Sequence, residues 1–149
     1  MTKTINCGVA GVGYLGRHHA RIYHSLEGCE LTGVFEPNDE AVEKICLEYG
    51  CKRFADLDEL ADACEVISVV CPTDKHAEVA LPLMKKGCHL LVEKPLCVSV
   101  PEAESLLEQA KESATVLQVG HIEHYNPVMA FLEEQVDCPR YLTGERLAP

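Results

Sequence analysis

The stretch GVAGVGYLGRHH, residues 8–19, holds three glycines within six positions, directly after an apolar run. Gly11, Gly13 and Gly16 follow the spacing Gly-x-Gly-x-x-Gly. Glycines this close together weaken any regular element, so they are useful where a backbone turns sharply or is approached closely. The elements on either side of the motif decide its meaning, because the spacing alone is weak evidence.

A strand-length apolar run precedes the motif and a segment of helical period follows it, and this pairing repeats along the chain. Strand-length apolar runs alternate with segments of helical period. Asn38 and Gly50 suit the two ends of one helix, and Ser99 with Glu102 forms a capping box at the start of another. The predicted strands are residues 5–11, 30–36, 51–55, 65–70, 88–93 and 114–120. The predicted helices are residues 14–26, 38–50, 56–62, 73 or 74 to 87, and a segment from Ser99 onward.

The apolar strands predict the fold class. Strands such as residues 65–70 read as apolar on both faces, so helices must cover both sides of a parallel sheet. This predicts a doubly wound α/β domain of the Rossmann type, with three αβα layers, over residues 1–120. The helix faces expected in its core are Ala41, Val42, Ile45, Cys46 and Tyr49; Ala77, Ala80, Leu81 and Met84; and Ala103, Leu106, Leu107 and Ala110.

The last segment, residues 121–149, differs from the alternating pattern before it. It offers a short helix around residues 128–136 and then RYLTGERL, residues 140–147, which reads as one strand. We expect this segment to be the connection to a C-terminal substrate domain, together with the first strand of that domain, which is absent from this chain.

Charge and composition exclude several classes of function. The formal net charge is −11, which argues against nucleic-acid partners because they require a basic surface. No apolar stretch reaches the roughly 20 residues that span a bilayer, and the N-terminus does not resemble a secretion signal. We therefore expect a cytoplasmic protein without membrane contact. Its nine cysteines contain no Cys-x-x-Cys pair, so they predict buried, reduced thiols and no metal site.

The glycine motif lies between the first predicted strand and the first predicted helix, as a dinucleotide site requires. Gly11 permits the tight turn, Gly13 lets a pyrophosphate approach the backbone, and Gly16 lets helix and strand pack closely. The phosphates would also face the positive end of the helix. The predicted phosphate-binding loop is Gly11, Val12, Gly13, Tyr14, Leu15 and Gly16. An ordinary glycine-rich turn is the alternative.

Glu36 ends the second predicted strand, where an acidic residue accepts the hydroxyls of a ribose. A carboxylate there would repel the 2′-phosphate of NADP. The next residues, Pro37 and Asn38, provide no cation to bind that phosphate. The sequence therefore predicts NAD rather than NADP, with Glu36, Pro37 and Asn38 at the adenosine end. A solvated glutamate is the alternative.

Two further motifs follow the ends of later strands. In CPTDKH, residues 71–76, we expect Cys71, Pro72 and Thr73 to line the nicotinamide side of the cleft. His76 either reaches the cofactor or lies on the surface of a helix.

In LLVEKPL, residues 90–96, the charged residues Glu93 and Lys94 follow an apolar strand. Pro95 restricts the backbone of Lys94, and a desolvated lysine has a lowered pKa that suits proton exchange with a carbinol oxygen. A solvated pair at a strand end is the alternative.

Together these motifs resemble the Gfo/Idh/MocA family of NAD(P)-dependent sugar oxidoreductases. The resemblance rests on A-G-x-G-x-x-G-x-x-H (residues 10–19), the acidic end of the second strand, P-T-x-x-H (residues 72–76) and E-K-P (residues 93–95). It implies a two-domain subunit that often forms homo-oligomers through its C-terminal domain. It also implies that Lys94 is a catalytic lysine, that Glu93 helps to place the nicotinamide ribose, and that further catalytic residues lie beyond position 149.

The branch of the family is suggested by VGHIEHYNP, residues 119–127, which looks most like enzymes acting on UDP-activated N-acetylhexosamines and their uronates. His124 stands where many relatives have arginine. The expected function is hydride transfer between C3 of such a sugar and NAD, with this chain alone binding NAD but not turning over. Two alternatives are a stand-alone dinucleotide-sensing module and a dehydrogenase of the same fold acting on a non-sugar substrate, such as a trans-dihydrodiol or a linear tetrapyrrole.

Overall fold

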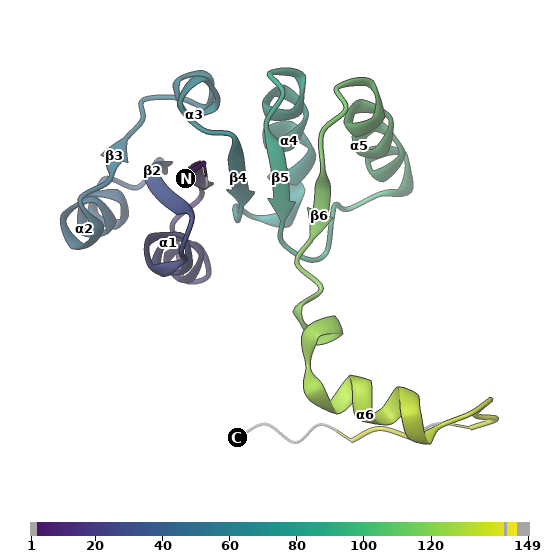
Figure 1. Ribbon diagram of the computed structural model, residues 1–149. Helices are drawn as coiled ribbons and strands as arrows, with labels where there is room; N and C mark the ends of the chain where they lie inside the picture. The colour runs from purple at the N-terminus through teal and green to yellow at the C-terminus, as the bar shows by residue number, and fades with distance from the viewer. Residues whose placement is uncertain (1–2, 142, 146–149) are drawn as a thin grey trace.

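The computed structural model describes residues 3–141 and 143–145, and its centre is a six-stranded parallel sheet (Figure 1). The strand order is β3-β2-β1-β4-β5-β6, so the direction of winding reverses between β1 and β4. The strands are β1 (Ile5–Ala10), β2 (Cys29–Phe35), β3 (Lys52–Arg53), β4 (Val66–Val69), β5 (His89–Val92) and β6 (Leu117–Val119). All neighbouring pairs are parallel, which confirms the predicted doubly wound sheet.

Helices lie on both faces of the sheet and complete the three predicted layers. In Figure 1, α3, α4 and α5 line the upper face, whereas α1 and α2 lie below the strands. The helices are α1 (Gly16–Ser25), α2 (Asp39–Tyr49), α3 (Leu57–Ala63), α4 (His76–Lys85), α5 (Val100–Glu112) and α6 (Pro127–Gln135), with short 3-10 turns at Thr73–Lys75 and Ile122–Tyr125. None of the helices that the structure describes is both long enough and apolar enough to cross a bilayer.

Local side chains set the predicted helix ends. The Asn38 side chain accepts a hydrogen bond from the Ala41 N–H at the start of α2, and Gly50 ends that helix with φ +67°. Ser99 accepts from the Glu102 N–H at the start of α5. A capping bond of this kind is worth about 1 kcal/mol, so local chemistry helps to fix where each helix begins.

The core consists of two apolar clusters, one on each face of the sheet. Ile67, Leu90 and Leu106 belong to the larger cluster under α3–α5, and Val9 and Val34 belong to the cluster under α1 and α2.

The expected helix faces differ from the observed core at two positions. Helix periodicity shows which residues share a face, but it does not fix where the edge of the buried face lies. Leu107 is 51% exposed on the outer side of α5. Leu83 of α4 is buried, although the sequence analysis did not assign it to the core.

The nine cysteines, all within the described residues, are free thiols. Cys7, Cys64 and Cys88 are buried and Cys138 is exposed, while the others lie between these extremes. Burial raises the pKa of the Cys7 and Cys64 thiols to about 12. Those thiols therefore behave as small apolar side chains rather than as nucleophiles.

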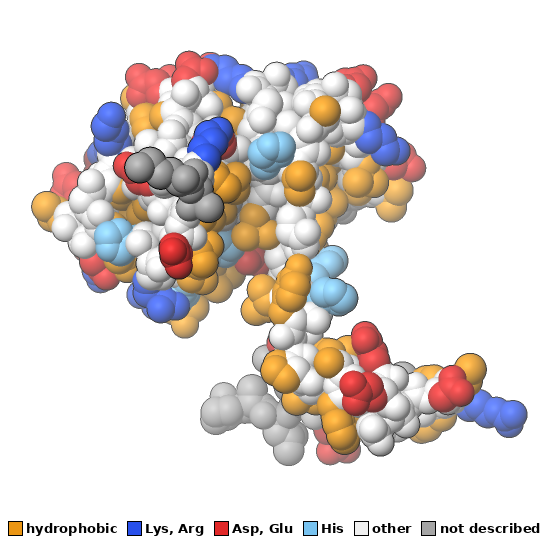
Figure 2. Space-filling view, in the orientation of Figure 1, with side chains coloured by type: hydrophobic (Ala, Val, Ile, Leu, Met, Phe, Trp, Pro, Cys, Tyr) orange, Lys and Arg blue, Asp and Glu red, His pale blue; other side chains and the backbone are white. Residues whose placement is uncertain are grey.

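The outer layer is incomplete over β5 and β6. On the α1 side of these strands, Leu91 and Gln118 line two hollows, one of which α1 borders through Ile22 and Tyr23. Helix α6 lies apart from the sheet in Figure 1, and none of its residues is buried. Figure 2 shows orange side chains along this part of the molecule, and those that are exposed are Val128, Met129, Phe131, Leu132 and Val136.

The predicted strand at residues 140–147 differs from what the structure describes. Residues 140–141 and 143–145 are not in a strand. Residue 142 and residues 146–147 lie outside the described part of the chain. A strand forms only beside a partner that takes up its backbone hydrogen bonds, and the described sheet ends at β6.

Candidate cofactor-binding site

The glycine loop joins β1 to α1, and its three glycines face different surroundings. Gly11 has φ +93°, and a Cβ on it would lie 2.8 Å from the Val70 carbonyl oxygen. A Cβ on Gly16 would lie 1.8 Å from the carbonyl oxygen of Gly11. A Cβ on Gly13 would have no atom within 4 Å. Gly11 and Gly16 are therefore required by packing, whereas Gly13 keeps the outer surface of the loop open.

The start of α1 suits an anion. Its N-cap residue, Leu15, makes no side-chain capping bond, and the first turn carries no acidic residue. Tyr14 and Leu15 are both exposed. The Arg17 and His18 N–H groups already bond to the Gly13 and Leu15 carbonyl oxygens, so the attraction of this helix end for phosphates comes from its partial positive charge.

Glu36 connects the end of β2 to the glycine loop. Its two carboxylate oxygens accept hydrogen bonds from the Val12 N–H and the Asn38 N–H, both at 2.9 Å. A carboxylate oxygen accepts more than one hydrogen bond, so both oxygens can still receive the hydroxyls of a ribose. Asn38 also caps α2 through its side chain, so its amide already has a structural role.

A cleft of about 380 Å³ lies at the carboxyl ends of β1, β2 and β4. In doubly wound sheets, ligands bind where the strand order reverses, and this cleft lies at that reversal. It brings together six of the predicted site residues, Gly11, Gly13, Glu36, Pro37, Cys71 and Pro72, and Thr73 begins the adjoining 3-10 turn. Sequence reasoning missed the other residues that line it, which are Ala10, Phe35, Val70, Lys75 and Val79. The available signal was that each of them lies within three positions of a predicted site residue.

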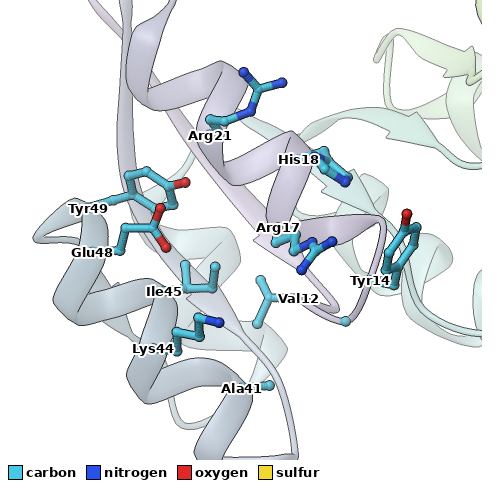
Figure 3. Close-up of a pocket in the computed structure, with 11 residues that line it drawn as sticks. Val12, Tyr14, Arg17, His18, Arg21, Ala41, Lys44, Ile45, Glu48 and Tyr49 are labelled. Carbon is cyan, nitrogen blue, oxygen red and sulfur yellow. The ribbon is translucent and has the colours of Figure 1, made fainter.

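A larger hollow of about 650 Å³ lies on the other side of the glycine loop, between α1 and α2. Figure 3 shows Arg17 and Lys44 entering it from opposite helices beside Val12. The Arg17 guanidinium lies 4.6 Å from the centre of the exposed Tyr14 ring. The hollow is outside the strand ends, so the smaller cleft is the better candidate for a dinucleotide. Two predicted loop residues, Val12 and Tyr14, border this second space instead of the cleft.

The E-K-P motif follows β5 at the same edge of the sheet. Glu93 is largely buried, and its carboxylate accepts a hydrogen bond from the Lys94 N–H at 3.1 Å. Lys94 itself is exposed, which corrects the expectation of a desolvated lysine. The reason is that β5 ends at Val92, so Lys94 extends beyond the sheet and its helix layers.

His76 lies in the interior at the start of α4 and is 1% exposed, so the alternative of a surface histidine is wrong. Its Nδ1 is 3.1 Å from the Pro95 carbonyl oxygen and 3.2 Å from that of Leu96, and its Nε2 is 2.9 Å from that of Cys71. The ring therefore holds the loop after β4 against the E-K-P segment. A direct contact between His76 and a cofactor stays a prediction. Both ring nitrogens already face backbone carbonyl oxygens, which argues against such a contact.

The family is decided by comparison with known proteins. Residues 5–121 match the model of an oxidoreductase family described by its NAD-binding Rossmann fold. The chain belongs to the Gfo/Idh/MocA oxidoreductase family. The predicted resemblance and the fold class are thereby confirmed, and the sheet and glycine loop are those of an NAD-binding Rossmann domain.

Individual relatives include enzymes that act on sugars. The chain is 40% identical over 143 residues to a UDP-N-acetylglucosamine 3-dehydrogenase of Acidithiobacillus ferrooxidans, covering 95% of this chain and 45% of the relative. A solved structure of that enzyme superposes with a TM-score of 0.84 at 36% identity, covering 89% of this chain and 43% of the other. GenD2 from gentamicin A biosynthesis, solved in complex with NAD, gives a TM-score of 0.86 at 26% identity, covering 91% and 39%. The chain thus spans less than half the length of these relatives.

Proposed function

We propose that this chain is the cofactor-binding part of an NAD-dependent oxidoreductase that transfers hydride between C3 of a nucleotide-activated hexosamine and the nicotinamide. The observation that carries the proposal is the meeting of Gly11, Gly13 and Glu36 in one cleft at the reversal of strand order. The similarity to a UDP-N-acetylglucosamine 3-dehydrogenase supports the sugar class.

The residues of the cleft have the chemistry that NAD binding requires. Gly13 leaves the loop surface open to a pyrophosphate, and the uncapped start of α1 favours its charge. Glu36 would accept the hydroxyls of the adenosine ribose and repel a 2′-phosphate, which favours NAD over NADP. Cys71, Pro72 and Thr73 would line the nicotinamide side. When bound, NAD supplies the hydride acceptor of the reaction.

Two residues of the E-K-P motif would act at the reacting end. Glu93 would accept hydroxyls of the nicotinamide ribose, since it follows β5 at the same carboxyl-end edge of the sheet as the cleft and lines the neighbouring hollow with Gly120. Lys94 would exchange a proton with the carbinol oxygen as hydride leaves the carbon, because it is exposed and lies two residues past the end of β5. Its exposure in this chain leaves room for a substrate and for a covering domain.

Residues 121–149 would lead into that second domain, which would hold the sugar and mediate homo-oligomer formation. Two observations support this assignment: the exposed apolar side chains of α6 and the apolar hollows over Leu91 and Gln118 on β5 and β6. Apolar surface of this kind is usually covered in the working protein. On this reading the 149-residue chain binds NAD but does not turn over sugar.

Calorimetric titration with NAD and NADP tests the cofactor part. We expect the chain to bind NAD more tightly than NADP, and Glu36→Ala to weaken NAD binding about tenfold or more while removing the preference, because hydrogen bonds to a charged acceptor are worth about 1.5–3 kcal/mol each. Glu43→Ala, an exposed carboxylate on α2, is the matched control and should change neither affinity. Equal affinities for NAD and NADP in the unmodified chain, or a Glu36→Ala variant that binds like it, would contradict the proposal.

The chemical part requires a polypeptide as long as the relatives. With UDP-N-acetylglucosamine and NAD, we expect NADH to form, and Lys94→Met to abolish that formation while leaving NAD affinity within about twofold. Lys111→Met, on the exposed side of α5, is the control and should retain activity. NADH formation with a dihydrodiol but not with the nucleotide sugar would support the non-sugar alternative. No turnover of any substrate would support the sensing module.

A further inference from the structure

Behind the E-K-P motif, three polar side chains from α1 and β4 form a row that ends at Glu93. His19 Nε2 lies 3.1 Å from Glu93 Oε1, and His19 Nδ1 lies 3.1 Å from Ser68 Oγ. Ser68 Oγ lies 2.9 Å from the Tyr23 hydroxyl. The Ser68 side chain is fully buried, and the His19 and Glu93 side chains are 16% and 13% exposed. Buried polar groups are costly unless they are fully hydrogen-bonded, and this row satisfies each of its members.

For a carboxylate at Glu93 and a neutral ring at His19, one set of hydrogen-bond directions satisfies the whole row. An ionised carboxylate only accepts, so His19 must donate from Nε2 to Glu93. A neutral ring that donates from Nε2 accepts at Nδ1, so Ser68 donates to His19 and accepts from the Tyr23 hydroxyl. Burial raises the pKa of Tyr23 to about 12, so the phenol keeps its hydrogen at neutral pH. All three donors therefore point toward the Glu93 carboxylate.

We propose that His19, supported by Ser68 and Tyr23, is a positioning residue that holds the Glu93 carboxylate in one orientation for the nicotinamide ribose. This inference rests on the proposed function, in which Glu93 meets that ribose. The remaining contacts of the carboxylate agree with it. Oε2 accepts from the Lys94 N–H, and a Cβ on Gly120 would lie 2.9 Å from Oε1, so the glycine leaves the space that the carboxylate occupies.

A purely structural role is the competing explanation, because the same bonds also join α1 to the sheet. The two explanations differ in which half of the dinucleotide they affect. ADP carries the adenosine and both phosphates but no nicotinamide ribose. Loss of positioning would weaken NAD binding alone, whereas a displaced α1 would weaken NAD and ADP together, since the glycine loop and the start of α1 serve both ligands.

The test compares NAD and ADP affinities of the chain by calorimetry. We expect the unmodified chain to bind NAD more tightly than ADP. His19→Ala should weaken NAD about tenfold and leave ADP within about twofold, as one lost charge-assisted hydrogen bond predicts. His19→Gln should recover most of the loss, because its amide N–H can donate to Glu93. Ser68→Ala and Tyr23→Phe should shift NAD affinity in the same direction by smaller factors.

His24→Ala provides the matched control, since His24 is an exposed histidine on the same helix. Nitrogen NMR of the ring gives a readout that needs no variant: the His19 tautomer should carry its hydrogen on Nε2. The inference is overturned if His19→Ala weakens NAD and ADP equally, if it changes neither, or if the ring carries its hydrogen on Nδ1 alone. An unmodified chain that binds neither ligand overturns the proposed function itself, which separates the two failures.

Discussion

Two alanine substitutions in the glycine loop should have different effects. Gly13→Ala should lower NAD affinity, whereas Gly16→Ala should lower the free energy of unfolding. A Cβ on Gly16 would lie 1.8 Å from the Gly11 carbonyl oxygen, although ordinary contacts begin at 3.4 Å, and both sides of that contact are backbone. Neither side can rotate away as a side chain would. We expect a loss of at least about 3 kcal/mol in the free energy of unfolding, at the upper end of overpacking effects.

Gly13→Ala places its methyl group in open space and requires no left-handed backbone. Its free energy of unfolding should stay the same or rise by about 0.4–1 kcal/mol, because alanine restricts the unfolded chain. NAD affinity should nevertheless fall about tenfold or more, since the methyl group occupies the surface that a pyrophosphate approaches.

Urea denaturation and NAD titration of both variants check these values. A Gly16→Ala protein as stable as the unmodified chain would refute the packing argument. A Gly13→Ala protein with full NAD affinity would refute the assignment of the loop to phosphate binding.

Three further predictions concern the interior. His76→Ala removes a buried ring and the N–H that it donates to the surrounding carbonyl oxygens, so urea denaturation should show a loss of about 2–4 kcal/mol in the free energy of unfolding, and an unchanged midpoint would contradict this role. Because burial raises the pKa of Tyr23 and of the Cys64 thiol to about 12, the unfolded chain loses these protons first, and the free energy of unfolding should fall as pH rises from about 9 to 12. Tyr23→Phe should reduce that fall in the free energy of unfolding, and a free energy that does not change between about pH 9 and 12 would contradict the prediction. Alkylation of the native chain, followed by mass spectrometry, should modify exposed Cys138 before buried Cys7; the reverse order would contradict the described burial.

Periodicity and capping chemistry were sufficient for most of the fold. Asn38 and Gly50 marked the ends of α2 because a side-chain cap and a left-handed glycine are local features that any context preserves. The Gly-x-Gly-x-x-Gly motif and Glu36 could be assigned to one cleft because the carboxyl ends of parallel strands share one edge of the sheet. These inferences need sequence spacing but no knowledge of packing angles.

The row behind Glu93 could not be predicted in the same way. Ser68 stands in a run that was interpreted as apolar, and its importance depends on the register that sets β4 beside β1 and brings Ser68 to His19 of α1. His19 was visible only as the last residue of a motif. The burial of His76 likewise depends on the segment after β5, whose Pro95 and Leu96 carbonyl oxygens lie against its ring. Such contacts join segments far apart in the chain, and no local signal encodes them.

The reversal of strand order between β1 and β4 has a consequence for the order of assembly. Adjacent β1 and β4 pair residues such as Cys7 and Val66, which are about sixty positions apart, so closing this pair costs more chain entropy than joining β1 to β2. The cleft forms only when that long loop closes, because Gly11 belongs to one side and Cys71 to the other. Cofactor binding therefore requires that the half of the sheet formed by β1–β3 is paired with the half formed by β4–β6. A chain cut before β4 would retain the glycine loop and Glu36 but would have only one wall of the crevice.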